Sequence, residues 1–246
     1  MTIVKYTTRY GVTFITDKGE YHTFKDFGMY PTAWPDIPPA EVKTMFIDLP
    51  GADGGLDMSE VTTGYPVYNN REGTFSYVVP REELWDGTLS QVKRALHGRR
   101  ARIIKDEEPD VYYYGRVSVE KMDVGKARGI VTIKADLEPY AYDMKTAGED
   151  WLWDPFSFET GVIRGYKSIT VDGETAVTIV SSALGGYPTI TTSAAGMTVT
   201  HDGTTYNLSK GKNALADIEL PRGEEEVELV FTGSGTVSID YRTGRL

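Results

Sequence analysis

The sequence predicts a mainly β protein in two parts: an N-terminal α+β domain of antiparallel strands with one helix, then a C-terminal antiparallel β-sandwich. Three observations favour this. Before residue 145, apolar and polar residues alternate along several short stretches, as in strands with two different faces. One stretch, near residues 89–97, has apolar residues at helical spacing. After Gly165, short strands recur with turns about every 8–12 residues. We expect domains at residues 1–147 and 148–246, with 148–160 as the entry segment of the second.

The first 40 residues predict a β-hairpin followed by a proline-rich loop. Residues 2–24 alternate around a turn at residues 17–20. Four prolines at positions 31, 35, 38 and 39 then exclude a regular ladder between residues 26 and 40. Trp34 and Ile37 are apolar anchors in this loop, so we expect it to be held against its own core or a neighbouring subunit.

Residues 42–49 predict a strand that ends abruptly in a glycine-rich turn. Apolar side chains at 45, 47 and 49 alternate with those at 44, 46 and 48. Pro50-Gly51 ends the strand, and Asp53-Gly54-Gly55 permits a left-handed bend. Asp48, Asp53 and Asp57 surround this turn, but their spacing departs from a calcium loop, so a structural turn is favoured over a metal site. An extended piece at 61–68, a turn at 69–73 and a strand at 74–79 follow.

The predicted helix spans residues 89–97. Residues 88–91 fit a capping box with Thr88 at the N-cap, and Gly98 is placed to end the helix. Strands are expected at 99–105, 112–122 and 130–137, with an acidic loop at 106–110. Val117 and Val119 are expected to be buried with residues 131, 133 and 135.

The second part predicts only strands and turns. Asp172-Gly173 and Asp202-Gly203 each predict a two-residue hairpin turn, because both support positive φ. The strands are expected at residues 169–171, 176–180, 188–192, 197–200, 206–208, 216–220, 227–231 and 236–241.

Composition excludes several classes of protein. There are no cysteines, which excludes disulfides, thiolate metal sites and cysteine nucleophiles. No apolar run approaches the ~20 residues of a membrane span, and we expect no signal peptide because the N-terminus lacks an apolar core. The net charge is −10, which disfavours general nucleic-acid binding.

One run of cations leaves three interpretations open. A nucleic-acid strip is disfavoured against a charged helix end and edge strand, or a patch in a subunit contact. Glu224-Glu225-Glu226 is a solvated turn or a partner for such a patch. The run comprises Lys93, Arg94, Arg99, Arg100, Arg102 and Lys105, with Tyr112, Tyr113 and Tyr114 nearby.

No pattern of catalytic residues is evident, so no catalytic residue, metal or cofactor is expected. The three histidines, His22, His97 and His201, are interpreted as solvated surface residues. Carboxylates flank an aromatic cluster near residue 150, as in glycosidases, but no other feature marks a cleft. The aromatics Trp151, Trp153, Phe156 and Phe158 are predicted to pack the domain junction rather than to stack on sugars; the flanking acids are Glu149, Asp150, Asp154 and Glu159.

Three sets of residues in this order resemble the siphophage distal tail proteins, the Dit family. The first is Phe27-Gly28 followed by the strand and glycine turn at residues 47–57. The second is the single helix at 88–97 between strands. The third is the run from Trp151 to Ile163, which is similar to the entry into that family's second domain. The resemblance covers nearly the whole chain.

The resemblance implies a structural role without enzymatic activity. It implies a six-fold ring built by the N-terminal domain, which joins the tail tube to a tail-tip hub protein. It also implies a galectin-like C-terminal domain where receptor-binding proteins attach, and a location in the virion tail tip after synthesis in the bacterial host cytoplasm. The interface residues predicted on this basis are Trp34, Ile37, Asp48, Pro50, Gly51, Asp53, Gly54, Gly55 and Asp57.

Two other functions remain as alternatives. A secreted carbohydrate-binding β-sandwich module is disfavoured by the expected lack of a signal peptide and by the large N-terminal domain. A glycan-cleaving enzyme using Asp154 or Glu159 is remote. No sequence-specific nucleic-acid binding and no membrane insertion are expected.

Overall fold

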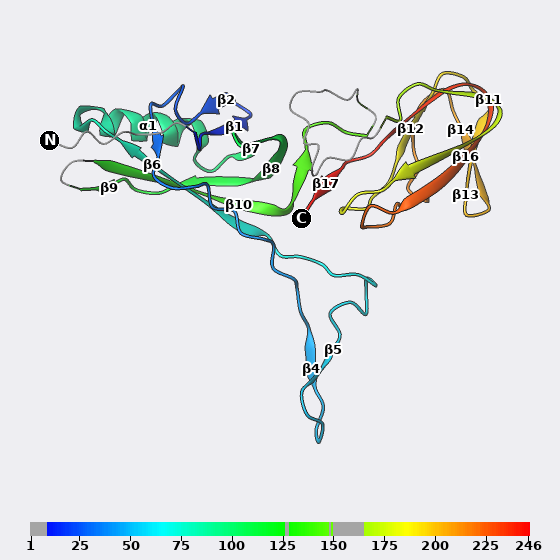
Figure 1. The fold of residues 1–246 in the computed structure, drawn as a ribbon, viewed down its shortest axis with the longest axis horizontal. Coiled ribbons are helices and arrows are strands. Elements are labelled where there is room, and N and C mark those ends of the chain that lie inside the picture. The colour runs from blue at the N-terminus through cyan, green and yellow to red at the C-terminus, as the bar shows by residue number, and fades with distance from the viewer. Residues whose placement is uncertain (1–8, 126–127, 148, 150–164) are drawn as a thin grey trace. The chain divides into compact units, whose positions relative to one another are not determined.

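The computed structural model describes residues 9–125, 128–147, 149 and 165–246. It confirms a mainly β protein of antiparallel strands with one α-helix in the described part of the chain (Figure 1). The chain divides into two compact units, Met1–Ala141 with Leu246, and Tyr142–Arg245. The expected domain boundary at 147/148 adjoins residues outside the described ranges and stays a prediction.

The first unit is built on one antiparallel sheet in the order β2-β1-β7-β8-β10-β6-β3, with β9 also paired to β10. Residues 12–22 form the expected hairpin, although its connection is only Asp17-Lys18, since Thr16 pairs with Gly19. The strands are β1 Val12–Thr16, β2 Gly19–His22, β3 Tyr30–Pro31, β6 Arg71–Val79, β7 Arg100–Lys105, β8 Glu108–Val119, β9 Asp123–Val124 and β10 Gly129–Asp143.

The core of the first unit lies between the inner face of this sheet and the helix. Alternate residues of β8 and β10 point inward, and Val117, Val119, Val131, Ile133 and Ala135 are all buried in one cluster, as predicted. Helix α1 (Trp85–Leu96) adds Val92 and Leu96 to it. The opposite face of the sheet therefore carries polar side chains.

Three local predictions in this unit are wrong. Helix α1 begins at Trp85, after a 3₁₀ turn at Glu82–Leu84, so Thr88 lies inside the helix and is buried rather than acting as an N-cap. The end is confirmed, since Gly98 follows it at φ +76°. The expected turn at 69–73 is strand from Arg71, since Gly73 pairs with Ala135 of β10. A Cβ on Gly73 would lie 2.9 Å from the Leu137 side chain, so this glycine is needed for close packing and does not mark a turn. Similarly, the acidic loop is shortened, since β8 begins at Glu108.

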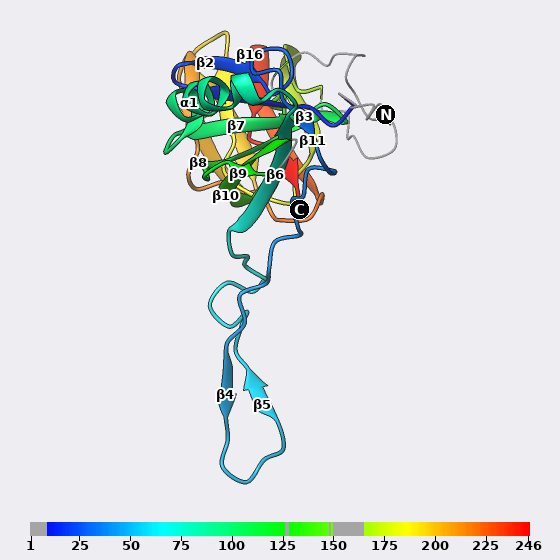
Figure 2. The same ribbon diagram turned by 90° about the vertical axis from the view of Figure 1, so that its left-hand side faces the viewer.

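The expected strand at 42–49 is only partly formed. β4 (Phe46–Asp48) pairs with β5 (Gly55–Asp57) in a hairpin that forms a separate small sheet. Residues 59–65 form turns and a bend rather than an extended piece. Tyr68 then bridges back to Val42. We call residues 44–58 the arm. Figure 2 shows β4 and β5 extending from the rest of the first unit.

The second unit is an antiparallel β-sandwich of strands in the order β14-β13-β16-β12-β15, with β11 also paired to β16. β16 connects β13 to β12 in this sheet, because its first half pairs with β13 and its second half with β12. Its core includes Ile179, Ile190, Leu229, Phe231 and Ile239. The strands are β11 Ile169–Val180, β12 Thr189–Thr192, β13 Met197–His201, β14 Thr204–Leu208, β15 Gly211–Ala214 and β16 Glu226–Asp240. The short strand β17 (Gly244–Arg245) pairs with β10 instead.

One Asp-Gly hairpin is confirmed and the other is wrong. Asp202 and Gly203 both have positive φ and connect β13 to β14. Asp172-Gly173 instead lies within β11, where Gly173 pairs with Gly233 of β16. Positive φ at both glycines bends the two strands together without ending either. The expected strands 227–231 and 236–241 are accordingly one strand, and the expected strand 216–220 is replaced by β15 at 211–214.

Candidate functional site

The arm has no buried side chain. Every residue from 41 to 57 is exposed. Ile47 lies directly opposite Leu56, so both side chains share one face of the hairpin. That face is uncovered: Met45, Ile47, Leu49 and Leu56 are 59%, 40%, 46% and 48% exposed. The predicted alternation is present, but neither face of the strand packs on a core.

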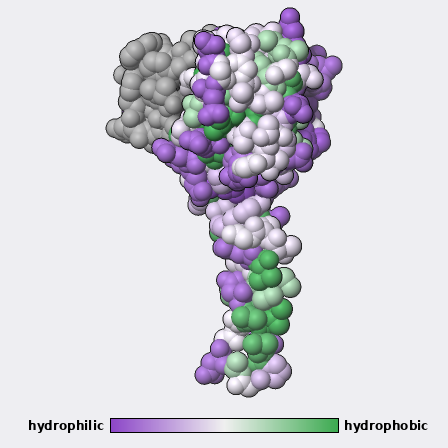
Figure 3. Space-filling model, turned by 90° about the vertical axis from the view of Figure 1, so that its right-hand side faces the viewer, coloured by the Kyte–Doolittle hydropathy of each residue, from purple (hydrophilic) through white to green (hydrophobic). Residues whose placement is uncertain are grey.

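The apolar side chains of the arm are contiguous. Figure 3 shows hydrophobic residues gathered along the arm. Phe46 lies on the other face and is 60% exposed. Isolated exposed apolar residues are ordinary, whereas a continuous exposed apolar patch marks a surface that contacts another protein.

The arm has an ordered base. Its two sides are joined by the hydrogen bonds Met58 N to Met45 O and Lys43 N to Val67 O, both 2.8 Å. The Asp57 carboxylate accepts hydrogen bonds from the Ser59 hydroxyl and from the Ser59 backbone N–H. These bonds, the hydroxyl one first, lower the pKa of Asp57 below its usual value. The hairpin is therefore held in one geometry although it has no core of its own.

The predicted interface residues fall in two places. Seven of them lie in the exposed arm, with Asp57 at its base: Asp48, Pro50, Gly51, Asp53, Gly54, Gly55 and Asp57. Gly51 and Gly54 have φ +85° and +74°, as the predicted left-handed bend requires. The sequence predicted this turn as an interface but not the apolar residues beside it. The alternation of apolar residues at 45, 47 and 49 was the signal that could have identified them.

The proline-rich loop is held by its own unit at one anchor and exposed at the other. Ile37 is half-buried against the core of the first unit. Trp34 is 55% exposed and its ring lies against that of Tyr10, with centroids 5.1 Å apart. Trp34 therefore adds an exposed aromatic surface outside the arm. The predicted junction aromatics Trp151, Trp153, Phe156 and Phe158 lie outside the described residues.

The interpretation of the histidines as solvated is wrong for His22. This side chain is buried, and its Nδ1 accepts hydrogen bonds from the backbone N–H groups of Phe24 and Lys25, both 3.1 Å. With Nδ1 accepting, the proton is on Nε2, which donates to Asp106 at 3.0 Å. His22 thus fixes the end of β2 and has no catalytic geometry. His97 is exposed and His201 is half-buried.

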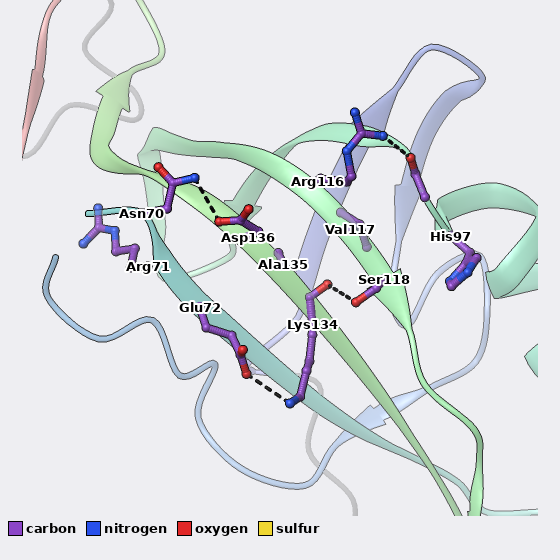
Figure 4. A pocket seen from close by; sticks show the side chains of 11 residues that line it. Asn70, Arg71, Glu72, His97, Arg116, Val117, Ser118, Lys134, Ala135 and Asp136 are labelled. Carbon is purple, nitrogen blue, oxygen red and sulfur yellow. Dashed lines mark hydrogen bonds and ion pairs between the residues drawn. The ribbon is translucent and has the colours of Figure 1, made fainter. Parts of the chain in front are cut away.

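A hollow of about 490 Å³ lies on the outer, polar face of the first unit's sheet. Figure 4 shows its side chains bonded to one another: Lys134 to Glu72, and Asn70 to Asp136. Lys134 also pairs with Glu120 at 3.5 Å, and the hydrogen bond to Glu72 is the main reason that its pKa is raised. Because these groups satisfy one another, the hollow has the character of a charged protein surface and not of a substrate site.

In the described part of the chain, the predicted basic run separates into cations that pair with a carboxylate and cations that do not. Arg99 bonds Asp17 at 2.9 Å, and Lys105 is buried against Glu108 at 2.7 Å. Arg100 and Arg102 instead lie exposed on the outer face of the sheet, over the rings of Tyr114 and Tyr112. Arg116, directly opposite Arg100, shares that face and donates to the Gly98 carbonyl.

The described part of the chain lacks two further features. Within residues 9–125, 128–147, 149 and 165–246, no group of three or more histidine or carboxylate side chains is arranged to hold a metal ion. No helix of those residues is long and apolar enough to cross a membrane.

Comparison with known proteins gives a structural similarity over the full length of the chain. The sequence matches no protein-family model and no curated protein. The structure is similar to the crystal structure of the SPP1 Dit protein, called a paradigm of the hub adsorption apparatus in phages that infect Gram-positive bacteria. The TM-score is 0.56 at 15% identity, over 96% of this chain and 99% of that one. At this identity the likeness shows a shared fold over both units.

Proposed function

We propose that this chain is a structural component of a phage or prophage tail tip, a distal tail protein that assembles into a six-fold hub ring. The observation that carries the proposal is the likeness in fold to a phage hub protein over essentially the whole length of both chains. A match of one common β-sandwich would support no particular role. Agreement in two successive domains of different architecture is much more specific.

The exposed arm supports the proposal that the protein functions as an assembly of several copies. A hairpin whose apolar face is exposed along its length gains stability when a neighbouring copy covers it. In a ring each subunit gives its arm to one neighbour and receives the arm of the other, which is a heterologous contact that closes. Trp34 provides a second exposed anchor in the same unit.

The remaining partners belong to the same proposal. One side of the ring joins the tail tube and the other joins the tail-tip hub protein, with the second unit available to receptor-binding proteins. The protein then resides in the virion after synthesis in the host cytoplasm. It acts as architecture and not as an enzyme.

The test is the mass of the purified protein, measured by light scattering after size-exclusion chromatography and checked by electron microscopy. We expect closed rings of six. The variant I47S/L56S removes the two opposed apolar side chains of the arm and is expected to shift the protein to monomers. Compared at concentrations where both proteins are monomeric, thermal unfolding should be unchanged, because neither side chain contacts a core.

The matched control is L84S/V124S, which removes two apolar side chains of similar exposure outside the arm. This control should assemble as the original protein does. A protein that remains monomeric at every soluble concentration contradicts ring assembly. Antibody labelling that places the protein anywhere but the far end of phage tails contradicts the tail-tip role.

A further inference from the structure

The exposed arginines on the first unit form a patch that we call the arginine face: Arg100, Arg102 and Arg116. They alternate with the buried residues Ala101, Ile103 and Val117, so all three point away from the core. Arg100 and Arg116 are directly opposite each other, and Arg102 is two residues along the same strand. The three side chains are therefore rooted within about 8 Å of one another.

This arrangement has an electrostatic cost inside one chain. Like charges directly opposite on a sheet repel, and none of the three arginines has a carboxylate partner among the described residues. Arg100 and Arg102 are held over the rings of Tyr114 and Tyr112, at 5.7 and 5.1 Å. Stacking fixes the guanidinium planes and leaves their edges available, which is the geometry that carboxylates recognise.

The neighbouring strands indicate which anion fits. Glu72 and Asp136 on β6 and β10 line the same outer face as Arg116, beside the hollow in Figure 4. A phosphate chain crossing this face would be repelled by those carboxylates, and the chain as a whole carries −10. A short, compact group of carboxylates on a protein surface can contact the arginines without crossing the part of the face that carries Glu72 and Asp136.

The second unit presents such a group. Glu224, Glu225 and Glu226 are consecutive and exposed, and none has an ion-pair partner in the described part of the chain. We call these residues the glutamate tip. Its backbone is fixed, because Ser181 N–H donates to Glu225 O and the Ser181 hydroxyl accepts from Glu225 N–H, both 2.9 Å. The tip is thus a preformed acidic surface.

We propose that the arginine face of one copy binds the glutamate tip of a second copy. Three unpaired cations meet three unpaired carboxylates of this same chain, and the two surfaces lie on different units. A contact between different surfaces of identical chains is heterologous, as a closed ring requires. The inference rests on the proposed self-assembly and adds a second contact to that of the arm.

The experiment uses two charge-reversal variants of the full chain, R100E/R102E and E224K/E225K. Each places like charges at the contact between copies, and we expect self-association at least about tenfold weaker, by sedimentation at low ionic strength. Arg116 is retained because it bonds the Gly98 carbonyl. The control K210E/K212E makes the same change in charge as R100E/R102E, at exposed lysines elsewhere, and should associate normally.

An equimolar mixture of the two variants is the decisive experiment. The reversed face of one variant then meets the reversed tip of the other, and the two unaltered surfaces also match, so assembly should return. It should weaken as salt is added, since exposed charges are screened. The proposal is overturned if both variants associate like the control, or if the mixture fails to regain assembly.

These outcomes also separate the two proposals. Loss of assembly in I47S/L56S with full assembly in both charge variants leaves the hub ring intact and removes only the arginine–glutamate contact. A wild-type protein that never associates removes both.

Discussion

At the scale of single residues, His22 is a buried polar side chain whose ring is hydrogen-bonded at both nitrogens. Its ring accepts two backbone N–H bonds and donates to Asp106. His22→Ala removes a buried side chain and leaves two part-buried backbone donors without their acceptor, and we expect it to lower the free energy of unfolding by about 2–4 kcal/mol. Urea unfolding followed by circular dichroism measures this change.

His97→Ala is the matched control for this prediction. His97 is exposed and accepts a single backbone hydrogen bond, from Val119 N–H at 3.0 Å. Water can replace that bond, so the control should lose less than about 1 kcal/mol. Equal losses in the two variants would contradict the assignment of His22 as a buried structural group.

Asp57 gives a pH dependence whose sign follows from its hydrogen bonds. Both Ser59 bonds favour the charged carboxylate, so the folded-state pKa lies below the usual 3.8. The bonds therefore order the base of the arm above that usual value and are lost as pH falls through the lowered folded pKa. An NMR titration of the Asp57 carboxyl carbon should show the lowered midpoint, and Ser59→Ala should raise it. A midpoint unaffected by Ser59→Ala would contradict this account.

At the scale of elements, the approach of β8 to β10 depends on Gly115. A Cβ at this position would lie 2.0 Å from the Asp136 backbone oxygen, which cannot move without breaking the sheet. Gly115→Ala should therefore destabilise the protein by more than about 3 kcal/mol. Gly87 in α1 is the matched control, because a Cβ there contacts nothing within 4 Å. Gly87→Ala should stabilise by about 0.5–1 kcal/mol. Thermal unfolding of both variants tests the pair, and similar effects would contradict it.

The same elements show which parts of the fold are predictable from sequence. The Asp202-Gly203 hairpin and the Gly98 helix end are local, because φ at one or two residues decides them. Asp172-Gly173 has the same local signal, but its pairing with Gly233, sixty residues away, makes it the middle of a long strand. Thr88 likewise fits a cap, yet residues from Trp85 onward already form the helix.

The candidate site was predictable only in part, for a related reason. Alternation at residues 45, 47 and 49 indicates a strand with two faces, but it does not say whether anything covers either face. Burial is a property of the surrounding structure. The glycine turn was recognised from its sequence, whereas the exposure of the apolar residues beside it required the coordinates.

At the scale of the whole molecule, assembly should change which peptide bonds a protease reaches. Chymotrypsin cleaves after large apolar residues that are not followed by proline, and Phe46 is 60% exposed in the arm. Leu49 is protected because Pro50 follows it. Exposed segments with few tertiary contacts are the preferred sites of cleavage. The monomeric I47S/L56S variant should therefore be cut first in the arm, after Phe46, with mass spectrometry identifying the fragments.

The assembled protein should resist cleavage at these same bonds, because a neighbouring copy then covers the arm. Leu84, outside the arm, is 47% exposed, is not followed by proline and provides an internal reference, since arm burial leaves its accessibility unchanged. The ratio of cleavage after Phe46 to cleavage after Leu84 thus measures burial of the arm independently of enzyme activity or concentration. Rings that form while the arm remains as sensitive as in the monomer would show that the subunit contact lies elsewhere, and the exposed apolar face would then belong to the contact with an adjoining tail protein.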